Sequence, residues 1–550
     1  MPDRLSGRGV SPGIGVGPVR AIAGAVPEPP AGQRHQGDAG AETRRALDAL
    51  EAVAADLEER GEKAGGEAKD VLVAQALMAR DPGLAELAGQ KVAGGSSAAR
   101  AVYEAFGVFR ELLAGAGDYI AARVADLDDI RDRAVAVLLG VPMPGVPDSA
   151  EPFVLVAPDL APADTALLDP AKVVGFVTEE GGPTSHTAIL ARAMGVPAVV
   201  ACPGCTALAE GTVVLVDGAS GEVRPDPPEE EVARARTESA KSAFTATGPG
   251  ATSDGHAVPL LANVGGPQDV PAALANGAEG VGLFRTEFLF LDRTTPPGED
   301  EQEAAYRAVL AAFPYVVVRT LDAGADKPLA FLAAAEEPNP ALGERGLRMS
   351  RRHPEVLQAQ LRALARAARD LPVELRAMAP MVADAEEAAF FAEACHAAGI
   401  AHAGVMIEIP AAALRARDLA AEADFFSVGT NDLAQYAFAA DRQVGALGGL
   451  QDPWQPALLD LVALAAEGGR PCGVCGEAAG DPALACVLTG LGITSLSMSP
   501  PALPAVRTAL AAHTADQCRR AASAARTARS AAGARERARA ELPGLSALGL

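Results

Sequence analysis

Apolar residues recur along this chain with two different spacings, and the change between them divides the sequence into regions. Between about residue 39 and Gly140, apolar residues three or four positions apart predict amphipathic helices, as in Leu47, Leu50, Val53 and Leu57. Further helical stretches are predicted near 67–81 and 98–114. This region is therefore expected to be an all-helical block.

Short β-branched runs replace the helical spacing between residues 152 and 225. These strand candidates alternate with helical segments and predict a compact α/β domain; they are FVLVA, KVVGFVTEE, PAVVAC and TVVLVDG. The acid-rich stretch 229–244 that follows is typical of an exposed connecting helix. Gly248, Pro249 and Gly250 then mark a boundary.

From residue 257 to about 500 a strand-then-helix rhythm repeats. The sequence contains eight strand candidates, at 258–263, 280–285, 315–320, 374–381, 403–408, 424–429, 471–475 and 494–498. Eight βα units in about 250 residues have the expected size of a TIM barrel. The Ala/Arg-rich tail after residue 513 predicts a solvated helix.

Composition narrows the classes of function. The 550-residue chain carries 47 Lys and Arg against 71 Asp and Glu, and this net charge of -24 argues against nucleic acid as the main partner. No apolar run approaches the roughly 18 residues of a membrane span. The N-terminus also lacks the apolar core of a signal peptide. We therefore expect a cytoplasmic protein without membrane insertion.

The seven cysteines are an odd and modest number for this length. That number is more typical of a reducing compartment than of a disulfide framework. Two C-x-x-C pairs, Cys202/Cys205 and Cys472/Cys475, could together form a four-cysteine zinc site. The two pairs lie in different predicted domains, which makes the zinc interpretation the weaker one.

One histidine stands where a helix is expected to begin. The segment 181–197, GGPTSHTAILARAMGVP, leads from glycines and a proline to His186, and Thr184 or Ser185 can serve as N-cap. Free amide groups and the helix dipole at such an N-terminus favour an anion, so His186 is well placed to carry a phosphoryl group. The alternative is a helix-capping turn whose histidine only packs or hydrogen-bonds.

Reactive side chains gather at the C-terminal ends of the predicted barrel strands, where the active site of a TIM barrel lies. They are Arg285, Arg319, Lys327, Glu408, Asn431, Asp432, Arg442 and Cys475. Carboxylates without histidines suit Mg²⁺, and guanidinium groups bind phosphate and carboxylate. Together these residues predict a pocket for a small phosphorylated carboxylic acid, although each alone could be a surface ion pair or a helix cap. Cys475 is either a small buried hydrophobe or a general acid.

Several long stretches match one known family in that family's order, over nearly the whole chain. They are VSPGIGVG, GGPTSHTAILARAMGVPAVV, GAEGVGLFRTEFLFLDR, RTLDAGADKPL, MIEIPAAAL, DFFSVGTNDLAQYAFAADR, CGVCGEAAGDPA and SLSMSP. The chain resembles enzyme I of the bacterial phosphoenolpyruvate-dependent sugar phosphotransferase system. The resemblance implies a multidomain α/β fold: a swivelling phosphohistidine α/β domain with an inserted helical domain, followed by a TIM (β/α)8 barrel.

The same resemblance implies a division into domains. Residues 1–24 and 144–225 would form the phosphohistidine domain, and residues 25–143 the helical domain that docks the phosphocarrier protein HPr. A linker helix at 226–250 would lead to the barrel at 251–550, which binds phosphoenolpyruvate (PEP) and is the family's dimerisation domain.

The chemistry implied by the resemblance is a two-step relay. His186 accepts the phosphoryl group of PEP through Nε2 and passes it to HPr for sugar uptake, and pyruvate is released. Cys475 protonates enolpyruvate at its methylene carbon, and Arg345 is a further arginine near the substrate. The implied substrate-binding residues are Arg285, Arg319, Asn431, Asp432 and Arg442, and the implied Mg²⁺ ligands are Glu408 and Asp432.

Three positions depart from the family pattern. Pro183 stands where many members have Arg, Ala325 where Gly is frequent, and Cys202 where Gly is common. None of the three removes a group that the chemistry requires. Pyruvate phosphate dikinase and PEP synthase share these parts but need an ATP-binding domain, for which this chain has no space. The remaining alternative is an enzyme I-type component of a regulatory or dihydroxyacetone-kinase phosphorelay.

Overall fold

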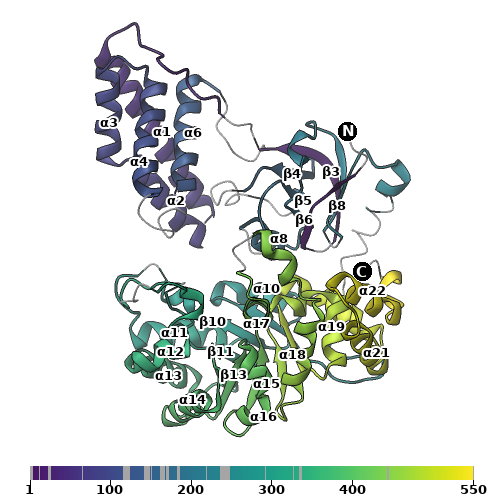
Figure 1. Ribbon diagram of the computed structural model, residues 1–550. Coiled ribbons are helices and arrows are strands. Elements are labelled where there is room, and N and C mark those ends of the chain that lie inside the picture. Colours follow the sequence, from purple (N-terminus) through teal and green to yellow (C-terminus); the bar gives the residue numbers. More distant parts are fainter. Residues whose placement is uncertain are drawn as a thin grey trace. The chain divides into compact units, whose positions relative to one another are not determined.

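The computed structural model forms two compact units, residues 1–239 and 240–550, each described here by itself (Figure 1). The residues that it describes are 4–11, 13–22, 26–64, 66–114, 124–141, 149, 151–160, 168, 172–182, 186–218, 220–233, 235, 248–291, 293–325, 327–332, 337–441 and 445–548. Among them, no helix combines the length and the apolarity needed to cross a membrane.

The helical block of the first unit packs around one apolar core, drawn in purple to blue in Figure 1. Its helices are α1 (Ala39–Ala64), α2 (Gly66–Ala79), α3 (Pro82–Ala93), α4 (Ala98–Ala114) and α6 (Val124–Leu139). The predicted stripe of Leu50, Val53 and Leu57 is buried in this core. Helix α3 was not predicted, although Asp81 caps it by accepting hydrogen bonds from the amides of Gly83 and Leu84.

The α/β part of the same unit is an eight-stranded mixed sheet in the order β1-β8-β7-β3-β4-β5-β6-β2. Its strands are β1 (Leu5–Ser6), β2 (Arg8–Ser11), β3 (Ile14–Ala21), β4 (Phe153–Ala157), β5 (Val173–Thr178), β6 (Ala198–Val200), β7 (Val213–Asp217) and β8 (Glu222–Pro225). Strands β3 and β4 are parallel neighbours in the sheet, yet the whole helical block lies between them in the sequence. The helical block is therefore an insertion into the α/β domain, as predicted.

Both faces of this sheet are covered. Alternate side chains of β4 enter two separate apolar clusters, with Val154 and Val156 in one and Phe153 and Leu155 in the other. Helix α8 (His186–Met194) links the parallel strands β5 and β6. The predicted connecting helix is helical at 229–233, and most of its remainder lies outside the described residues. The boundary predicted at 143/144 also falls outside them.

The second unit contains a closed barrel of eight parallel strands, the architecture predicted from the strand rhythm. Its strands are β9 (Leu260–Val264), β10 (Val281–Arg285), β11 (Tyr315–Arg319), β12 (Glu374–Ala379), β13 (His402–Ile407), β14 (Phe425–Val428), β15 (Cys472–Val474) and β16 (Ser495–Met498). Every predicted strand end lies within about two residues of the observed one, well inside the usual uncertainty of element boundaries.

Helices surround the barrel and bury its outer face (Figure 1). They are α10 (Val270–Ala275), α11 (Glu299–Leu310), α12 (Leu347–Arg352), α13 (Pro354–Ala368), α14 (Ala385–Ala397), α15 (Pro410–Leu414), α16 (Ala416–Leu419), α17 (Thr430–Phe438), α18 (Pro456–Ala466), α19 (Pro482–Gly490) and α20 (Leu503–Ala511). In the barrel wall, Phe426 and Val428 point outward into this helical layer, whereas Phe425 points inward. That alternation decides which side chains reach the barrel interior.

The prediction of a solvated helix after residue 513 is confirmed in that the tail is helical, but it is wrong in that one face of the tail is buried. The tail forms α21 (Ala515–Arg526), α22 (Ala531–Glu541) and α23 (Gly544–Ala547). Cys518, Ala521 and Ala525 of α21 are buried in the core of the barrel unit. The arginines occupy the other face, where Arg526 pairs with Asp460 of α18 at 2.6 Å. Alanines three or four residues apart thus supply an apolar stripe that the arginine content concealed.

Candidate active site

His186 opens helix α8, so the structure places it at a helix N-terminus as the sequence predicts. The next residue, Thr187, is buried, and its hydroxyl donates a hydrogen bond to Asp159 Oδ1 at 3.2 Å, which ties the first turn to the end of β4. The candidate caps Thr184 and Ser185, and the departure Pro183, lie outside the described residues. The first amides of this helix have no partner within the helix itself.

The other predicted site residues stand at the C-terminal end of the barrel. Arg285 and Arg319 are the last residues of β10 and β11 and are paired in register, so the two guanidinium groups start from adjacent positions. Glu408 directly follows β13, and Cys475 directly follows β15. Asn431 and Asp432 lie in the first turn of α17, directly after β14. Arg442 lies outside the described residues.

A glycine lets two of these segments meet. A Cβ atom on Gly476 would lie 2.0 Å from Oγ1 of Thr430, the residue that opens α17. Only glycine permits this approach. The amide of Cys475 also donates to the carbonyl of Val428 at 3.0 Å. These contacts hold the loop that carries Cys475 against the turn that carries Asp432.

Buried ion pairs connect the charged side chains into one network. Arg345 is fully buried and grips Asp322 with two parallel hydrogen bonds, Nε to Oδ1 and Nη2 to Oδ2, both of 2.9 Å. Its Nη1 donates to Asp432 Oδ1 at 3.1 Å. Arg319 pairs with Glu287 at 2.7 Å and with Asp322 at 3.4 Å. The predicted Arg345 is therefore a central member of the network.

The pKa values of two buried carboxyl groups in this network are shifted in opposite directions. Burial alone would raise the pKa of Asp322, but Arg319, Lys327 and Arg345 hold that pKa well below its usual range. Burial raises the pKa of Glu408 to about 8, and the negative charges of Asp432 and Asp322 contribute to that rise. Arg319 and Arg345 act in the opposite direction, but they do not offset the burial of Glu408 and the two negative charges.

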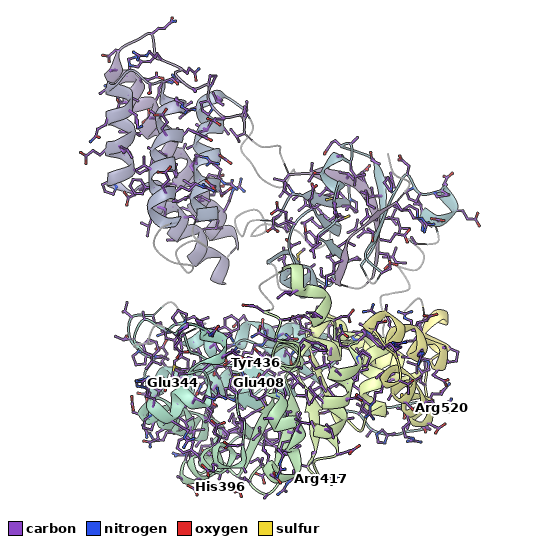
Figure 2. The ribbon with its side chains drawn as sticks, in the orientation of Figure 1. Glu344, His396, Glu408, Arg417, Tyr436 and Arg520 are labelled. Atoms are coloured by element: carbon purple, nitrogen blue, oxygen red, sulfur yellow. The ribbon has the colours of Figure 1, made fainter. Side chains whose placement is uncertain are left out.

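Glu408 is held in position by the backbone. The amide of Met381 donates to Glu408 Oε1 at 2.7 Å. Met381 has a φ of 59°, a left-handed conformation that is rare for residues other than glycine. Figure 2 shows Glu408 and Tyr436 toward one end of the barrel and His396 toward the other, because α14 runs antiparallel to the strands.

Two guanidinium groups keep free hydrogen-bond donors at this end. Arg285 makes no hydrogen bond or ion pair with any residue that the structure describes, and burial with the nearby charge of Arg319 lowers its pKa. The Nε of Arg319 is buried and also lacks a partner among the described residues. Unpaired buried donors of positive charge are unfavourable unless an anion binds them. The pair therefore fits a phosphate or carboxylate ligand.

Cys475 faces the interior of the barrel. Its side chain belongs to the inner apolar cluster with Leu283, Val317 and Met406. Burial raises the pKa of its thiol to about 11, so the thiol carries its proton at neutral pH. The outward-facing Cys472 packs in the helical layer instead. Since Cys472 and Cys475 occupy opposite faces of the wall, they cannot share a zinc ion.

Two members of the network were missed by sequence reasoning, although both lie inside stretches quoted for the family resemblance. Asp322 follows Arg319 by three residues, and Glu287 follows Arg285 by two. A charged residue so close to a barrel strand end is a signal that could have been read. Gln360 of α13 gave no such signal. Its side-chain amide donates to the hydroxyl of Thr286 at 3.0 Å and so supports the network from the helical layer.

Family models match three consecutive parts of the chain. Residues 6–123 match the N-terminal part of PEP-utilising enzymes, residues 149–221 their mobile domain, and residues 239–515 their PEP-binding domain. The phosphoenolpyruvate-protein phosphotransferase of Streptomyces coelicolor is 64% identical over 555 residues, covering 99% of this chain and 100% of its own length. This chain belongs to the phosphoenolpyruvate-protein phosphotransferase family.

More distant members of the phosphoenolpyruvate-protein phosphotransferase family match nearly as much of the chain. The protein of Haloferax volcanii is 41% identical and that of Bacillus subtilis 38% identical, and each match covers 92% of this chain and 94% of the relative. The charged end of the barrel lies within the part that matches the PEP-binding domain. His186 lies within the part that matches the mobile domain. Nothing in these matches favours the regulatory-branch alternative.

Proposed function

We propose that this chain transfers the phosphoryl group of PEP to Nε2 of His186 and then to HPr, releasing pyruvate. The observation that carries the proposal is the arginine pair Arg285 and Arg319, with free donors, beside the buried carboxyls of Glu408 and Asp432. An anion with both phosphate and carboxylate groups matches that charge distribution, and PEP is such an anion.

Substrate binding is assigned to the barrel end. Arg285 and Arg319 take phosphate and carboxylate oxygens, since planar guanidinium groups bind such oxygens in pairs. Asn431, and Arg442 beyond the described residues, complete the set. Asp432 orients Arg345 through their 3.1 Å hydrogen bond, so the cationic side of the pocket is fixed before substrate arrives.

The residues present fit a magnesium ion. Within the described part of the chain, no three histidine, cysteine or carboxylate side chains gather into a self-sufficient metal site. Mg²⁺ commonly takes only one or two carboxylates, with substrate oxygens and water as its other ligands. Glu408 and Asp432 would hold it, and the mutual repulsion of these buried carboxyl groups, which helps to raise the pKa of Glu408, favours a cation there. When bound, it would neutralise charge on the phosphoryl group.

The phosphoryl step forms one bond and breaks another. Neutral Nε2 of His186 attacks phosphorus, and the bond between phosphorus and the enol oxygen breaks. Most of the catalysis in such a transfer is positioning and electrostatic stabilisation, which the arginines supply. The enolate that remains takes the Cys475 proton at its methylene carbon and becomes pyruvate. The protonated state of the buried thiol at neutral pH supports this role.

Delivery to HPr belongs to the first unit. We assign HPr docking to the helical domain at 25–143 and the phosphohistidine to the domain formed by 1–24 and 144–225. A linker at 226–250 would let the phosphohistidine domain swing away from the barrel domain at 251–550, through which the chain would dimerise. The proposed setting is sugar uptake in the cytoplasm.

Radiolabelled PEP tests the proposal on the full chain. With Mg²⁺ the protein should acquire acid-labile label, and added HPr should remove that label. Chelation of Mg²⁺ should stop the labelling. His186→Ala should abolish all labelling, because no other group accepts the phosphate in this scheme.

His396→Ala is the matched control for that experiment. His396 is an exposed histidine on α14 and has no part in the proposed relay. This variant should label as the wild type does. Acid-labile label on the His186→Ala protein, or label that does not pass to HPr, would refute the proposed function.

A further inference from the structure

A small cavity lies inside the barrel, below the predicted active site. It has a volume of about 20 Å³, which is enough for at least one water molecule. Tyr315, Phe425 and Ser495 each begin a strand, so the cavity occupies the N-terminal half of the barrel. The proposed chemistry takes place at the opposite end.

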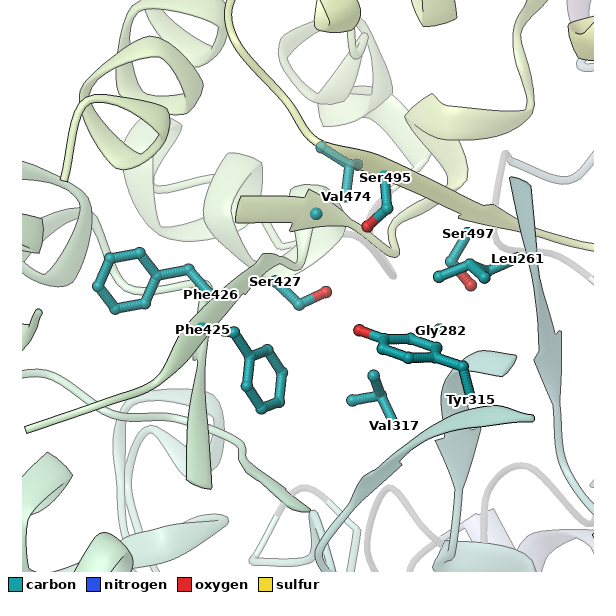
Figure 3. A pocket seen from close by; sticks show the side chains of 11 residues that line it. Leu261, Gly282, Tyr315, Val317, Phe425, Phe426, Ser427, Val474, Ser495 and Ser497 are labelled. Atoms are coloured by element: carbon teal, nitrogen blue, oxygen red, sulfur yellow. The ribbon is translucent and has the colours of Figure 1, made fainter. Parts of the chain in front are cut away.

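Hydroxyl groups converge on this cavity. Figure 3 shows the oxygens of Tyr315, Ser427 and Ser495 pointing into the same space. Ser497 also lines the cavity, but its hydroxyl is engaged, donating to Asn263 Oδ1 at 2.6 Å. A water molecule needs two to four polar partners, and three hydroxyls supply them. The cavity is therefore suited to an ordered water rather than to an apolar void.

Toward the C-terminal end of the barrel, the cavity approaches the proposed general acid, Cys475. Ser427 is paired in register with Gly473, two residues before Cys475, and hydrogen bonding from its hydroxyl lowers the pKa of the Cys475 thiol. The thiol itself donates to the carbonyl of Val428 at 3.6 Å. Ser427 lines the cavity as well, so one side chain touches both the thiol and the cavity. Ser427 is only 6% exposed and Cys475 only 2%, so bulk water has little direct access to the sulfur.

Toward the N-terminal end of the barrel, the cavity approaches solvent. Tyr315 and Ser495 are both partly exposed at the beginning of their strands. The Arg376 guanidinium lies over the rings of Tyr315 and Phe425, at 5.2 and 5.1 Å from their centroids. Arg376 in turn pairs with the exposed Glu374. The hydroxyls that line this cavity thus lie between the N-terminal end of the barrel and the thiol.

We propose that Ser427 and the water of this cavity return a proton to Cys475 after each turnover, from the barrel end opposite to the substrate. This inference rests on the proposed function, because it assumes that Cys475 protonates the enolate of pyruvate. Ser427 acts through Cys475 and does not touch the substrate, so it is a positioning and relay residue.

The proton balance of the relay is simple. When the S–H bond of Cys475 breaks, its proton forms a C–H bond at the methylene carbon and leaves a thiolate. The Ser427 O–H proton then passes to sulfur, while the cavity water gives a proton to the Ser427 oxygen. A solvent proton entering past Tyr315 and Ser495 restores the water. One solvent proton is consumed for each pyruvate formed, and no group is oxidised or reduced.

Reprotonation of Cys475 from the N-terminal end of the barrel has a physical advantage. While product and phosphate charge occupy the upper end, water there is displaced, and a proton arriving from that side must pass the bound anion. The lower route is separate from the substrate. By this route the Cys475 thiol would regain its proton before pyruvate leaves the site.

An isotope jump tests the relay directly. Protein equilibrated in H₂O is mixed rapidly with PEP and Mg²⁺ in D₂O, and the reaction is quenched after one turnover. The methyl group of pyruvate then records whether the Cys475 thiol still held protium. Wild-type thiol should exchange quickly and give mainly deuterated product. Ser427→Ala should retain roughly threefold more protium or above, because the relay hydroxyl is gone.

The phosphorylation of His186 in the same samples separates the two proposals. Its first-turnover rate should stay within about twofold of the wild type in Ser427→Ala, because the enolate forms before the proton is needed. Ser427→Thr keeps a hydroxyl and should restore rapid exchange. Thr489→Val is the matched control, since it removes a buried hydroxyl in α19, where Thr489 donates to the carbonyl of Ala485. It should behave as the wild type.

Two results would overturn the relay. One is equal protium content in wild type and Ser427→Ala, which would mean that the thiol exchanges through the substrate end. The other is increased retention in Thr489→Val as well, which would mean that any lost hydroxyl slows exchange. A wild-type protein that forms no phosphohistidine would instead refute the proposed function.

Discussion

The two ends of the barrel interior are built from opposite chemistry on the same eight strands. The C-terminal end buries acidic and basic side chains: Glu287, Arg319, Asp322, Arg345, Glu408 and Asp432. The N-terminal end holds aromatic rings, serine hydroxyls and a cavity of about 20 Å³. One guanidinium, that of Arg376, lies over the rings of Tyr315 and Phe425 there.

The difference shows what each end contributes. Burying charges costs free energy that ion pairing only partly recovers, so a charged core is a poor way to stabilise a barrel. Buried cationic groups with unused hydrogen-bond donors are favourable where an anionic ligand binds those donors. The cavity at the N-terminal end is lined by rings, hydroxyls and apolar side chains, which need no charged ligand. In TIM barrels, function concentrates at one end and stability at the other.

The largest effect is expected from breaking the charged network at its centre. Asp322→Ala removes the partner that Arg345, Arg319 and Lys327 share. The cations are then left uncompensated, and the barrel should lose about 3–5 kcal/mol of stability. The chain has a single tryptophan, so fluorescence of the buried Trp454 reports urea unfolding of the barrel unit alone.

Glu374→Ala is the control at the other end. Glu374 is exposed, with its side chain 45% accessible, and among the residues that the structure describes its ion pair is with Arg376. Its removal should change barrel stability by no more than about 0.5 kcal/mol. Equal losses in the two variants would contradict the view that the ends differ in kind.

Glu408→Gln separates function from stability at the charged end. The amide can still accept the hydrogen bond from Met381, and it removes the repulsion with Asp432 that helps raise the Glu408 pKa to about 8. Barrel stability should therefore be unchanged or higher by about 1 kcal/mol. Labelling from PEP should slow roughly a hundredfold, because a charge that helps to hold the cation is gone.

Matched measurements on Glu408→Gln decide between two roles. Labelling rate and Trp454 unfolding should move in opposite directions if Glu408 serves the ligand. A less stable protein with unimpaired labelling would show that Glu408 is structural and would remove it from the predicted metal site.

The positions of the site residues at the ends of the barrel strands can be predicted from the sequence. Each barrel strand is a short apolar run, and the residue type at its C-terminal end is visible without coordinates. Arg285, Arg319, Glu408 and Cys475 therefore all stand where they were predicted. Their roles in binding and proton transfer stay predictions.

The connections within the site cannot be predicted in the same way. Nothing local in the sequence indicates that Arg345 grips Asp322, 23 positions away, or reaches Asp432, 87 positions away. Such pairing depends on how loops after different strands fold over one another. The direction of the Glu408 pKa likewise depends on which charges gather around it.

Two errors elsewhere have local causes. Helix α3 was not predicted, although Asp81 before a proline is a normal helix start. The C-terminal tail was read from its arginines, whereas Cys518 and Ala522 supply the buried face of α21. In the tail a composition signal concealed a spacing signal, and in α3 a capping signal was overlooked.

Apart from the control variants, the smallest effect is expected from the stacked arginine at the N-terminal end. Arg376→Met keeps the aliphatic contact with Tyr315 and Phe425 but loses two cation–π interactions, which should cost the barrel about 1 kcal/mol. Labelling from PEP should not change, because no charge at the substrate end is altered. Arg417→Met, an exposed arginine of α16, should change stability by no more than about 0.5 kcal/mol. If Arg376→Met slowed labelling as strongly as Glu408→Gln, the two ends would not be separable, and stability and function would share one network along the whole barrel.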